Sequence, residues 1–277
     1  MTVYSRILRT PGVAVIVLST VIGRMPIGIS GLAILLYVRE VTGSFASAGL
    51  CTGALALGSA LGAPLQGRLV DRRGVAMLAP LAAVHSAGLL GVWAAGAADA
   101  SAPALAAPAR KASAAMPPVS SVLRSRWPYL LAERPELMGG AFALDSVLIE
   151  IVFVVGPLVT TAIVATAGPQ YALLVSAACV MTGTLLMLGR LAGKPGPKPT
   201  RAGRRAYGLG ALADPGLRTL VFASLPVGFA LGSVEVAVPA FSEAEGSKAL
   251  AGTGRLGPGL AGQPAQHQQG ARHHAGG

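Results

Sequence analysis

Residues 12–38 read GVAVIVLSTVIGRMPIGISGLAILLYV, a long apolar run in which Arg24 is the single charged side chain. A membrane-spanning helix needs about 20 predominantly apolar residues, so this run is long enough to cross a bilayer. Arg6 and Arg9 precede it, it is longer than the apolar part of a signal peptide, and no small-residue cleavage site closes it. We therefore expect a retained helix whose N-terminus lies in the cytoplasm.

The composition of the whole chain agrees with a membrane protein. Of the 277 residues, 53% are hydrophobic and only 12% are charged, whereas a soluble domain carries about 25% charged residues. The mean hydropathy is +0.63. Five further apolar runs follow the first, at residues 44–66, 75–97, 138–165, 171–188 and 220–241. The sequence thus predicts an all-α membrane protein with six clear spans.

The stretch 100–120 does not fit this pattern, because it is rich in Ala and Pro, contains Arg110 and Lys111, and has one Leu. A surface hairpin or a non-helical segment is one interpretation. The loop with Arg68, Arg72 and Arg73 and the loop with Arg124, Arg126 and Arg134 lie on the same side of the membrane only if two helices separate them. This parity favours a distorted fourth helix and about seven spans in total.

The polar parts of the chain set the domain boundaries. We expect a transmembrane bundle over residues 1–190, a basic cytoplasmic linker over 191–217, a seventh helix over 218–241 and a disordered tail over 242–277. The second predicted span carries two close pairs of small residues, which predicts tight helix packing on both of its faces, Gly49 with Gly53 and Gly58 with Gly62.

The net charge of +11 raises the question of nucleic-acid binding. The basic residues are spread over short stretches between apolar runs, which is typical of cytoplasmic loops, so we expect no nucleic-acid partner. Cys51 and Cys179 lie within apolar runs and are expected to act as small hydrophobic residues. No metal-ligand spacing is present outside a His-containing tail, and neither a metal nor a cofactor is predicted.

The motif Gly67-Arg68-Leu69-Val70-Asp71-Arg72-Arg73-Gly74, between the second and third spans, resembles the loop signature of the major facilitator superfamily. Members of that family usually have two basic residues after the last Gly, where this chain has Val75 and Ala76. In the fifth span, Gly156-Pro157 resembles the core of the antiporter signature of drug-proton exchangers, although the flanking glycines are absent. A plain proline kink is the alternative interpretation of that dipeptide.

The resemblance covers residues 5–245 and implies the six-helix N-terminal half of such a transporter followed by the seventh helix. It also implies a conformational switching role for the loop motif, namely Gly67, Asp71, Arg72 and Gly74. The later helix that Asp71 would face in the family is absent from this sequence. Because alternating access requires two halves that move about a shared site, we expect this chain alone to transport poorly.

Four charged residues lie inside predicted spans, where charges are costly and usually mark a solute or proton pathway: Arg24, Asp145, Glu150 and Glu235. We expect Arg24 and Glu150 to face the interior of the bundle. Asp145 and Glu150 are five residues apart, about 140° around a helix, so they cannot both point into one cavity. For Asp145, a solvated position near the end of its helix is the alternative.

These observations favour a secondary active transporter of a small solute in the plasma (inner) membrane, bacterial in its composition, and either proton-coupled or facilitative. An inactive or regulatory fragment of a transporter is the alternative. An intramembrane enzyme is a remote one, because His85 is the only histidine before the tail and no nucleophile motif accompanies it. The substrate, the direction of transport, the coupling ion and the oligomeric state do not follow from the sequence.

Overall fold

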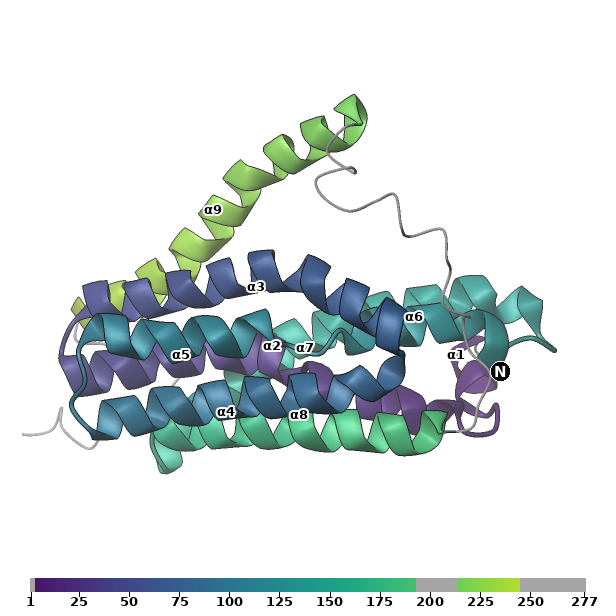
Figure 1. Ribbon diagram of the computed structural model, residues 1–277, viewed down its shortest axis with the longest axis horizontal. Coiled ribbons are helices and arrows are strands. Elements are labelled where there is room, and N and C mark those ends of the chain that lie inside the picture. The colour runs from purple at the N-terminus through teal and green to yellow at the C-terminus, as the bar shows by residue number, and fades with distance from the viewer. Residues whose placement is uncertain (1–2, 193–213, 245–277) are drawn as a thin grey trace, which may run out of the picture.

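The computed structural model describes residues 3–192 and 214–244, and all regular structure in these residues is helical. Two short 3₁₀ turns, η1 (Val75–Met77) and η2 (Pro135–Leu137), precede α4 and α7. The helices are α1 (Val3–Leu8), α2 (Val13–Thr42), α3 (Phe45–Arg73), α4 (Leu78–Ala97), α5 (Ala102–Ala114), α6 (Val119–Leu130), α7 (Met138–Thr166), α8 (Pro169–Leu191) and α9 (Pro215–Ala244). Figure 1 shows α2 to α8 lying lengthwise beside one another as one elongated bundle.

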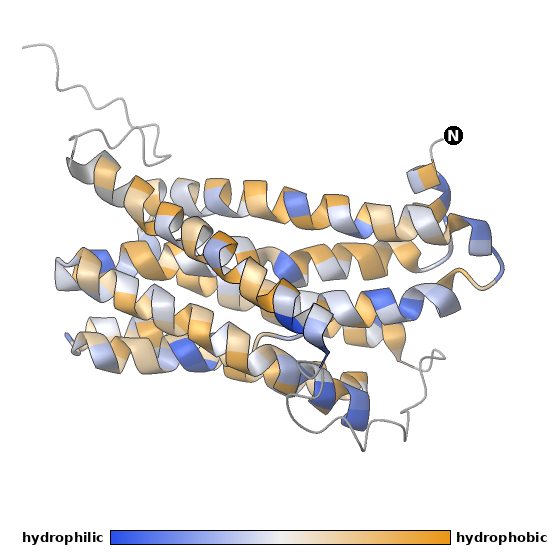
Figure 2. Ribbon diagram, turned by 90° about the horizontal axis from the view of Figure 1, so that it is seen from above, coloured by the Kyte–Doolittle hydropathy of each residue, from blue (hydrophilic) through white to orange (hydrophobic). Residues whose placement is uncertain are grey.

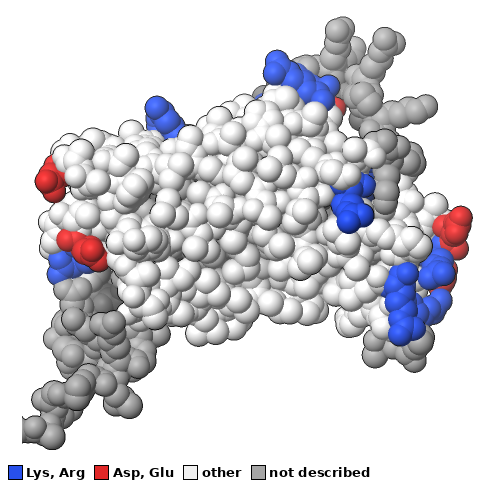
Figure 3. Space-filling view, turned by 90° about the horizontal axis from the view of Figure 1, so that it is seen from below, with Lys and Arg blue, Asp and Glu red and all other residues white. Residues whose placement is uncertain are grey.

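The six predicted spans are confirmed as helices that are long and apolar enough to cross a membrane: Val13–Thr42, Phe45–Arg73, Val75–Ala97, Pro135–Thr166, Pro169–Leu191 and Arg218–Val238. Their outer surfaces are apolar as well. On α3 the side chains of Leu57, Leu61 and Leu65 are each about 60% exposed, a pattern that suits a lipid surface. Apolar residues dominate the helices (Figure 2), and a broad belt without charged side chains separates the two ends of the face drawn in Figure 3.

Helix α2 is the centre of the bundle and packs against α8, α7, α3 and α6. Glycine pairs bring it close to two of these helices, Gly23 against Gly183 of α8 and Gly28 against Gly156 of α7. A Cβ added at Gly183, Gly28 or Gly156 would lie within 3 Å of the backbone of the facing helix, whereas one added at Gly23 would make ordinary contacts. Small residues are what let membrane helices approach to this distance.

The prediction of tight packing on two faces of the second span is half right. Gly58 and Gly62 of α3 face the backbone of α5 near Arg110 and Ala114. In contrast, a Cβ added at Gly49 or Gly53 would meet no atom of the described chain within 4 Å. The pair Gly49 and Gly53 is therefore not a close helix contact among the described residues.

The fourth element is a helix in two pieces. α5 and α6 follow one another in the same direction along the bundle, separated by the non-helical residues 115–118 (Figure 1). α5 begins beside Cys51, whose thiol donates to the carbonyl of Ala102, and α6 ends in the apolar cluster that contains Ile7 and Leu131. By helical rise α5 is about 20 Å long and α6 about 18 Å, so each is too short to cross a bilayer alone.

This arrangement corrects the predicted boundaries. The stretch 100–120 is neither a surface hairpin nor an unstructured segment, and the element it starts continues to Leu130. Arg124 and Arg126 were expected in a loop, but both lie in α6. A helical stripe of Val119, Val122, Leu123 and Trp127 buries the inner face of α6 and keeps the basic residues within the bundle.

Two apolar clusters fill the core, one toward each end. The first includes Ile29, Ile34 and Tyr37 of α2, and the second includes Val13 and Ile16 of the same helix. The part of α2 between them buries polar groups instead, namely Ser19, Thr20 and Arg24. The interior thus becomes polar partway along the bundle.

Helix α9 contacts the described part of the bundle mainly through α3, and none of the described side chains in its most apolar window is buried. The side chain of Glu235 in this helix lies outside the described residues. So do most of the predicted linker and nearly all of the predicted tail.

We predict that Gly183→Ala destabilises the bundle by about 1 to 3 kcal/mol, because the new methyl group would press on the backbone of Gly23. Gly189→Ala is the matched control on the same helix, since nothing lies within 4 Å of a Cβ there. Thermal unfolding of the purified protein in detergent measures both. Equal melting temperatures for the two variants would contradict the close contact.

Candidate functional site

Three charged side chains from three helices meet inside the bundle. Asp145 of α7 accepts hydrogen bonds on both carboxylate oxygens: Oδ1 from Nη2 of Arg24 on α2, and Oδ2 from Nε of Arg124 on α6 at 2.5 Å. Nη1 of Arg24 also donates to the Asp145 backbone carbonyl at 3.5 Å. We call Arg24, Asp145 and Arg124 the charge triad.

The local sequence explains why each residue points inward. Arg24 follows Thr20 by four residues and precedes Gly28 by four, so all three lie on one face of α2, and that face is buried. Asp145 occupies the narrow face of α7 that also buries Ala141 and Val152. That face packs on α2, which brings the carboxylate to the guanidinium.

Burial divides the triad into a closed and an open part. The side chains of Arg24 and Asp145 are 1% and 0% exposed, whereas that of Arg124 is 53% exposed. Nε of Arg24 is buried and has no hydrogen-bond partner. Arg124 uses only its Nε on Asp145, so its two terminal nitrogens remain available on the open side.

The triad carries a net charge of +1, because two guanidinium groups share one carboxylate. Burying an ion is expensive unless an opposite charge and hydrogen bonds compensate for it. Asp145 compensates for one arginine only. The site therefore combines a strong attraction between α2 and α7 with a surplus of one positive charge inside the bundle.

The two predicted pathway acids of α7 lie in opposite environments. Asp145 is buried, so the alternative of a solvated position near a helix end is wrong. Glu150 is exposed and bonds to no described residue, so the expectation that it faces the interior is also wrong. The spacing gives the reason: because Asp145 points to α2, a residue about 140° further round α7 points away from it.

A second polar cluster surrounds the break between α5 and α6. Nδ1 of His85 lies 2.8 Å from the carbonyl oxygen of Ala112, and the side-chain amide of Gln66 donates to that of Ala114 at 2.7 Å. Ser59 and Ser113 share a further hydroxyl contact. These side chains satisfy carbonyls at the C-terminal end of α5, which makes a broken helix tolerable within a membrane.

The loop motif ends α3. Gly67, Asp71 and Arg72 belong to its last two turns, and Asp71 is exposed. Gly74 caps the helix with φ 81°, a conformation that favours glycine, and its N–H donates to Val70 O at 2.7 Å. The motif thus forms a helix end at the turn into η1 and α4.

Helix α7 continues without interruption through Gly156 and Pro157 to Thr166. Gly156 is buried against Gly28 and is a packing residue. Neither residue contacts the charge triad through a hydrogen bond.

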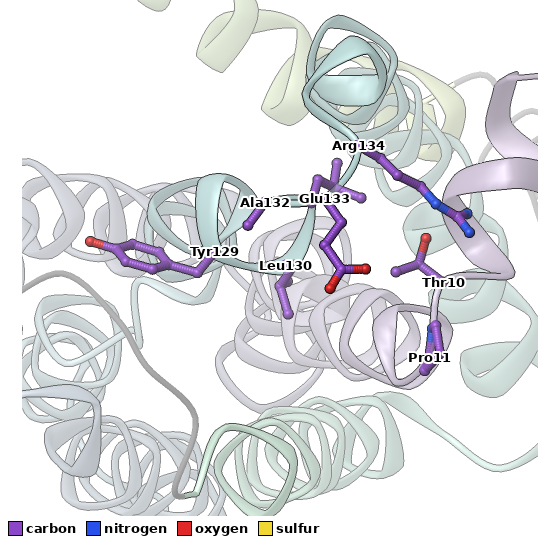
Figure 4. A pocket seen from close by; sticks show the side chains of 8 residues that line it. Thr10, Pro11, Tyr129, Leu130, Ala132, Glu133 and Arg134 are labelled. Atoms are coloured by element: carbon purple, nitrogen blue, oxygen red, sulfur yellow. The ribbon is translucent and has the colours of Figure 1, made fainter.

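A surface pocket of about 240 Å³ lies at the end of the bundle where α6 turns toward α7, and Figure 4 shows its lining side chains. Thr10 and Pro11 form one wall, and residues 129–134 form the other, with Glu133 and Arg134 among them. None of the predicted pathway residues lines this pocket. Within the described ranges, no group of His, Cys, Asp and Glu has the arrangement of a metal site.

Arg124 is the member of the triad that the sequence analysis missed, because it was placed in a loop. The signal that would have found it is the spacing of Val119, Val122, Leu123 and Trp127, which repeats every three to four residues. A helix with that stripe places Arg124 one position past Leu123, at the edge of the buried face.

No protein-family model, curated protein or solved structure matches this chain.

We predict that Asp145→Asn destabilises the protein by about 3 to 5 kcal/mol, because it leaves two guanidinium groups without their carboxylate and one of them buried. Glu150→Gln, on the same helix, should change stability by less than about 0.5 kcal/mol. Chemical unfolding in detergent measures both variants.

The double variant Arg24→Gln/Asp145→Asn tests whether the loss of stability comes from the unpaired charge of Arg24 or from the Asn side chain itself. It should recover part of the lost stability, since it removes the buried uncompensated charge. If the double variant is destabilised by the sum of the effects of Arg24→Gln and Asp145→Asn measured singly, Arg24 and Asp145 do not interact.

Proposed function

We propose that this protein is a secondary transporter of a small solute in the plasma (inner) membrane, built on a bundle like the N-terminal half of the major facilitator superfamily. The observation that carries the proposal is the charge triad, because ionisable groups inside membrane helices are costly and mark solute or proton pathways. The six apolar helices and the motif at the α3 end support the same interpretation.

The arrangement of the helices suits transport in a second way. Substrate sites of secondary transporters lie within the membrane, where discontinuous helices bring backbone groups and charges together. Here Val119, the first residue of α6, lies beside Gly23, the residue before Arg24, so the break in the fourth element is level with the triad. Arg24 is about 17 Å along α2 from its first residue by helical rise.

We further propose that the end of the bundle with the N-terminus faces the cytoplasm. The helix bounds place most arginines at this end, and cytoplasmic loops are enriched in Lys and Arg. They are Arg6, Arg9, Arg68, Arg72, Arg73, Arg134 and Arg190, whereas the opposite end has Arg39, Glu40 and Asp99.

A proton-coupled cycle needs a carboxylate that can gain and lose a proton. Both oxygens of Asp145 are already held by guanidinium groups. Glu150 is bonded to no described residue and is exposed. We therefore assign solute contact to the triad and no proton-carrying role to either acid of α7.

The test is solute flux in liposomes that contain only this purified chain. We expect weak but saturable flux for one class among radiolabelled amino acids, sugars, organic acids and organic cations, above that of empty liposomes. Arg124→Gln should reduce this flux at least tenfold, whereas Arg190→Gln, at the end of α8, should leave it unchanged. A folded, membrane-inserted chain that transports none of these classes would contradict the proposed function.

A further inference from the structure

The surplus positive charge of the triad indicates what kind of solute the site takes. Asp145 balances one of the two arginines, and the other acidic side chain within α7, Glu150, is exposed and points away from the triad. The described part of the chain therefore supplies no second carboxylate to this cluster. A negative charge from outside the chain would complete it.

The geometry of Arg124 shows where such a charge can bind. The guanidinium has five N–H donors, and Asp145 takes the one on Nε. The two terminal nitrogens form a planar fork that matches the two oxygens of a carboxylate. Because this side chain is half exposed, a solute reaches the fork without breaking the buried bond between Arg24 and Asp145.

Arg24 strengthens this site from the buried side. Its guanidinium lies on the other oxygen of the same carboxylate, and its Nε is buried with no partner. A positive charge in a low-dielectric interior acts on its neighbours far more strongly than one in water. The first turn of α6 has no side-chain cap and begins beside Gly23, so this helix N-terminus adds a partial positive charge at the same level.

We propose that the solute is a small organic anion whose carboxylate binds the terminal nitrogens of Arg124 while Asp145 stays paired with Arg24. This inference rests on the proposed transport function for its role, but the binding itself is testable without transport. The bound anion would bring the triad to zero net charge. An uncharged or cationic analogue of the same shape would gain nothing from the fork.

Acetate, acetamide and acetamidinium are the probes, because they have nearly the same size and carry charges of −1, 0 and +1. The purified full chain in lipid-free detergent is titrated with each probe at constant ionic strength, and its unfolding temperature is followed by tryptophan fluorescence. We expect a saturable rise in unfolding temperature with acetate only, since a ligand that binds the folded state stabilises it.

The variants assign the effect to the site. Arg124→Gln should weaken the apparent affinity for acetate at least tenfold, because the half-exposed side chain is removed while the neutral Arg24–Asp145 pair remains. Arg190→Gln should bind acetate as the original chain does. A response to acetamide equal to that to acetate, no response to acetate, or a response that persists in Arg124→Gln would each overturn the proposal.

A membrane lipid is the other possible source of an anion for this site. If phosphatidylglycerol raises the unfolding temperature in an Arg124-dependent way and acetate does not, the counter-charge is a lipid headgroup and the solute proposal fails. Failure here is separate from failure of the proposed function: flux of a cation or a sugar would keep the transporter and overturn the anion site. Acetate binding without any flux would keep the anion site and overturn the proposed transport function.

Discussion

One buried carboxylate determines how the central helices fit together. Asp145 accepts hydrogen bonds from Arg24 of α2 and Arg124 of α6, and it lies on the face of α7 that packs on α2. Arg24 and Asp145 are buried and find no water that could replace each other, so α2 and α7 must meet at one level, and half-exposed Arg124 joins them there from α6. The glycine pairs of α2 with α7 and α8 allow the close approach that this meeting requires.

The break in the fourth element follows from the same constraint. Its first piece is weakly apolar, and Pro117 and Pro118 end the helical hydrogen bonding before α6 begins. At the C-terminal end of α5, the carbonyl of Ala114 accepts a hydrogen bond from Gln66 of α3, and that of Ala112 makes contact with His85 of α4. The fourth element is thus too weakly apolar for a typical membrane span, and polar side chains of its neighbours hold it in the bundle. Its second piece, α6, brings Arg124 to the triad.

Much of the fold could be predicted from the sequence, since hydrophobic runs determine membrane helices directly. All six clear spans appear as apolar helices of sufficient length. The parity of the basic loops favoured a fourth span at about residues 100–120, and the structure has the helices α5 and α6 over residues 102–130. Hydropathy could not show their extent, because α6 is held by a narrow stripe and not by overall hydrophobicity. The short helix α1 was not predicted for the same reason.

The candidate site was harder to predict, because it depends on which way side chains point. Arg24 lies in the middle of an apolar run, and its position alone made it a candidate; the structure shows that it is buried. Because Asp145 and Glu150 are about 140° apart around α7, only one of them could face inward. Choosing between the two requires the direction in which α7 faces relative to α2. That direction is set by Gly28 and Gly156, whose contact is long-range and leaves no periodic signal in either helix.

The central claim is that the open side of the triad faces water and not lipid, which cysteine accessibility tests most directly. Ser121 is exposed and lies three residues before Arg124 on the same side of α6, whereas Val154 of α7 is 63% exposed on the apolar surface. Single cysteines at these positions, with Cys51 and Cys179 changed to Ala, are treated with a membrane-impermeant thiol reagent in lipid vesicles. We expect position 121 to react and position 154 to stay protected, and protection of position 121 to the same degree as position 154 would mean that the open side of the triad faces lipid.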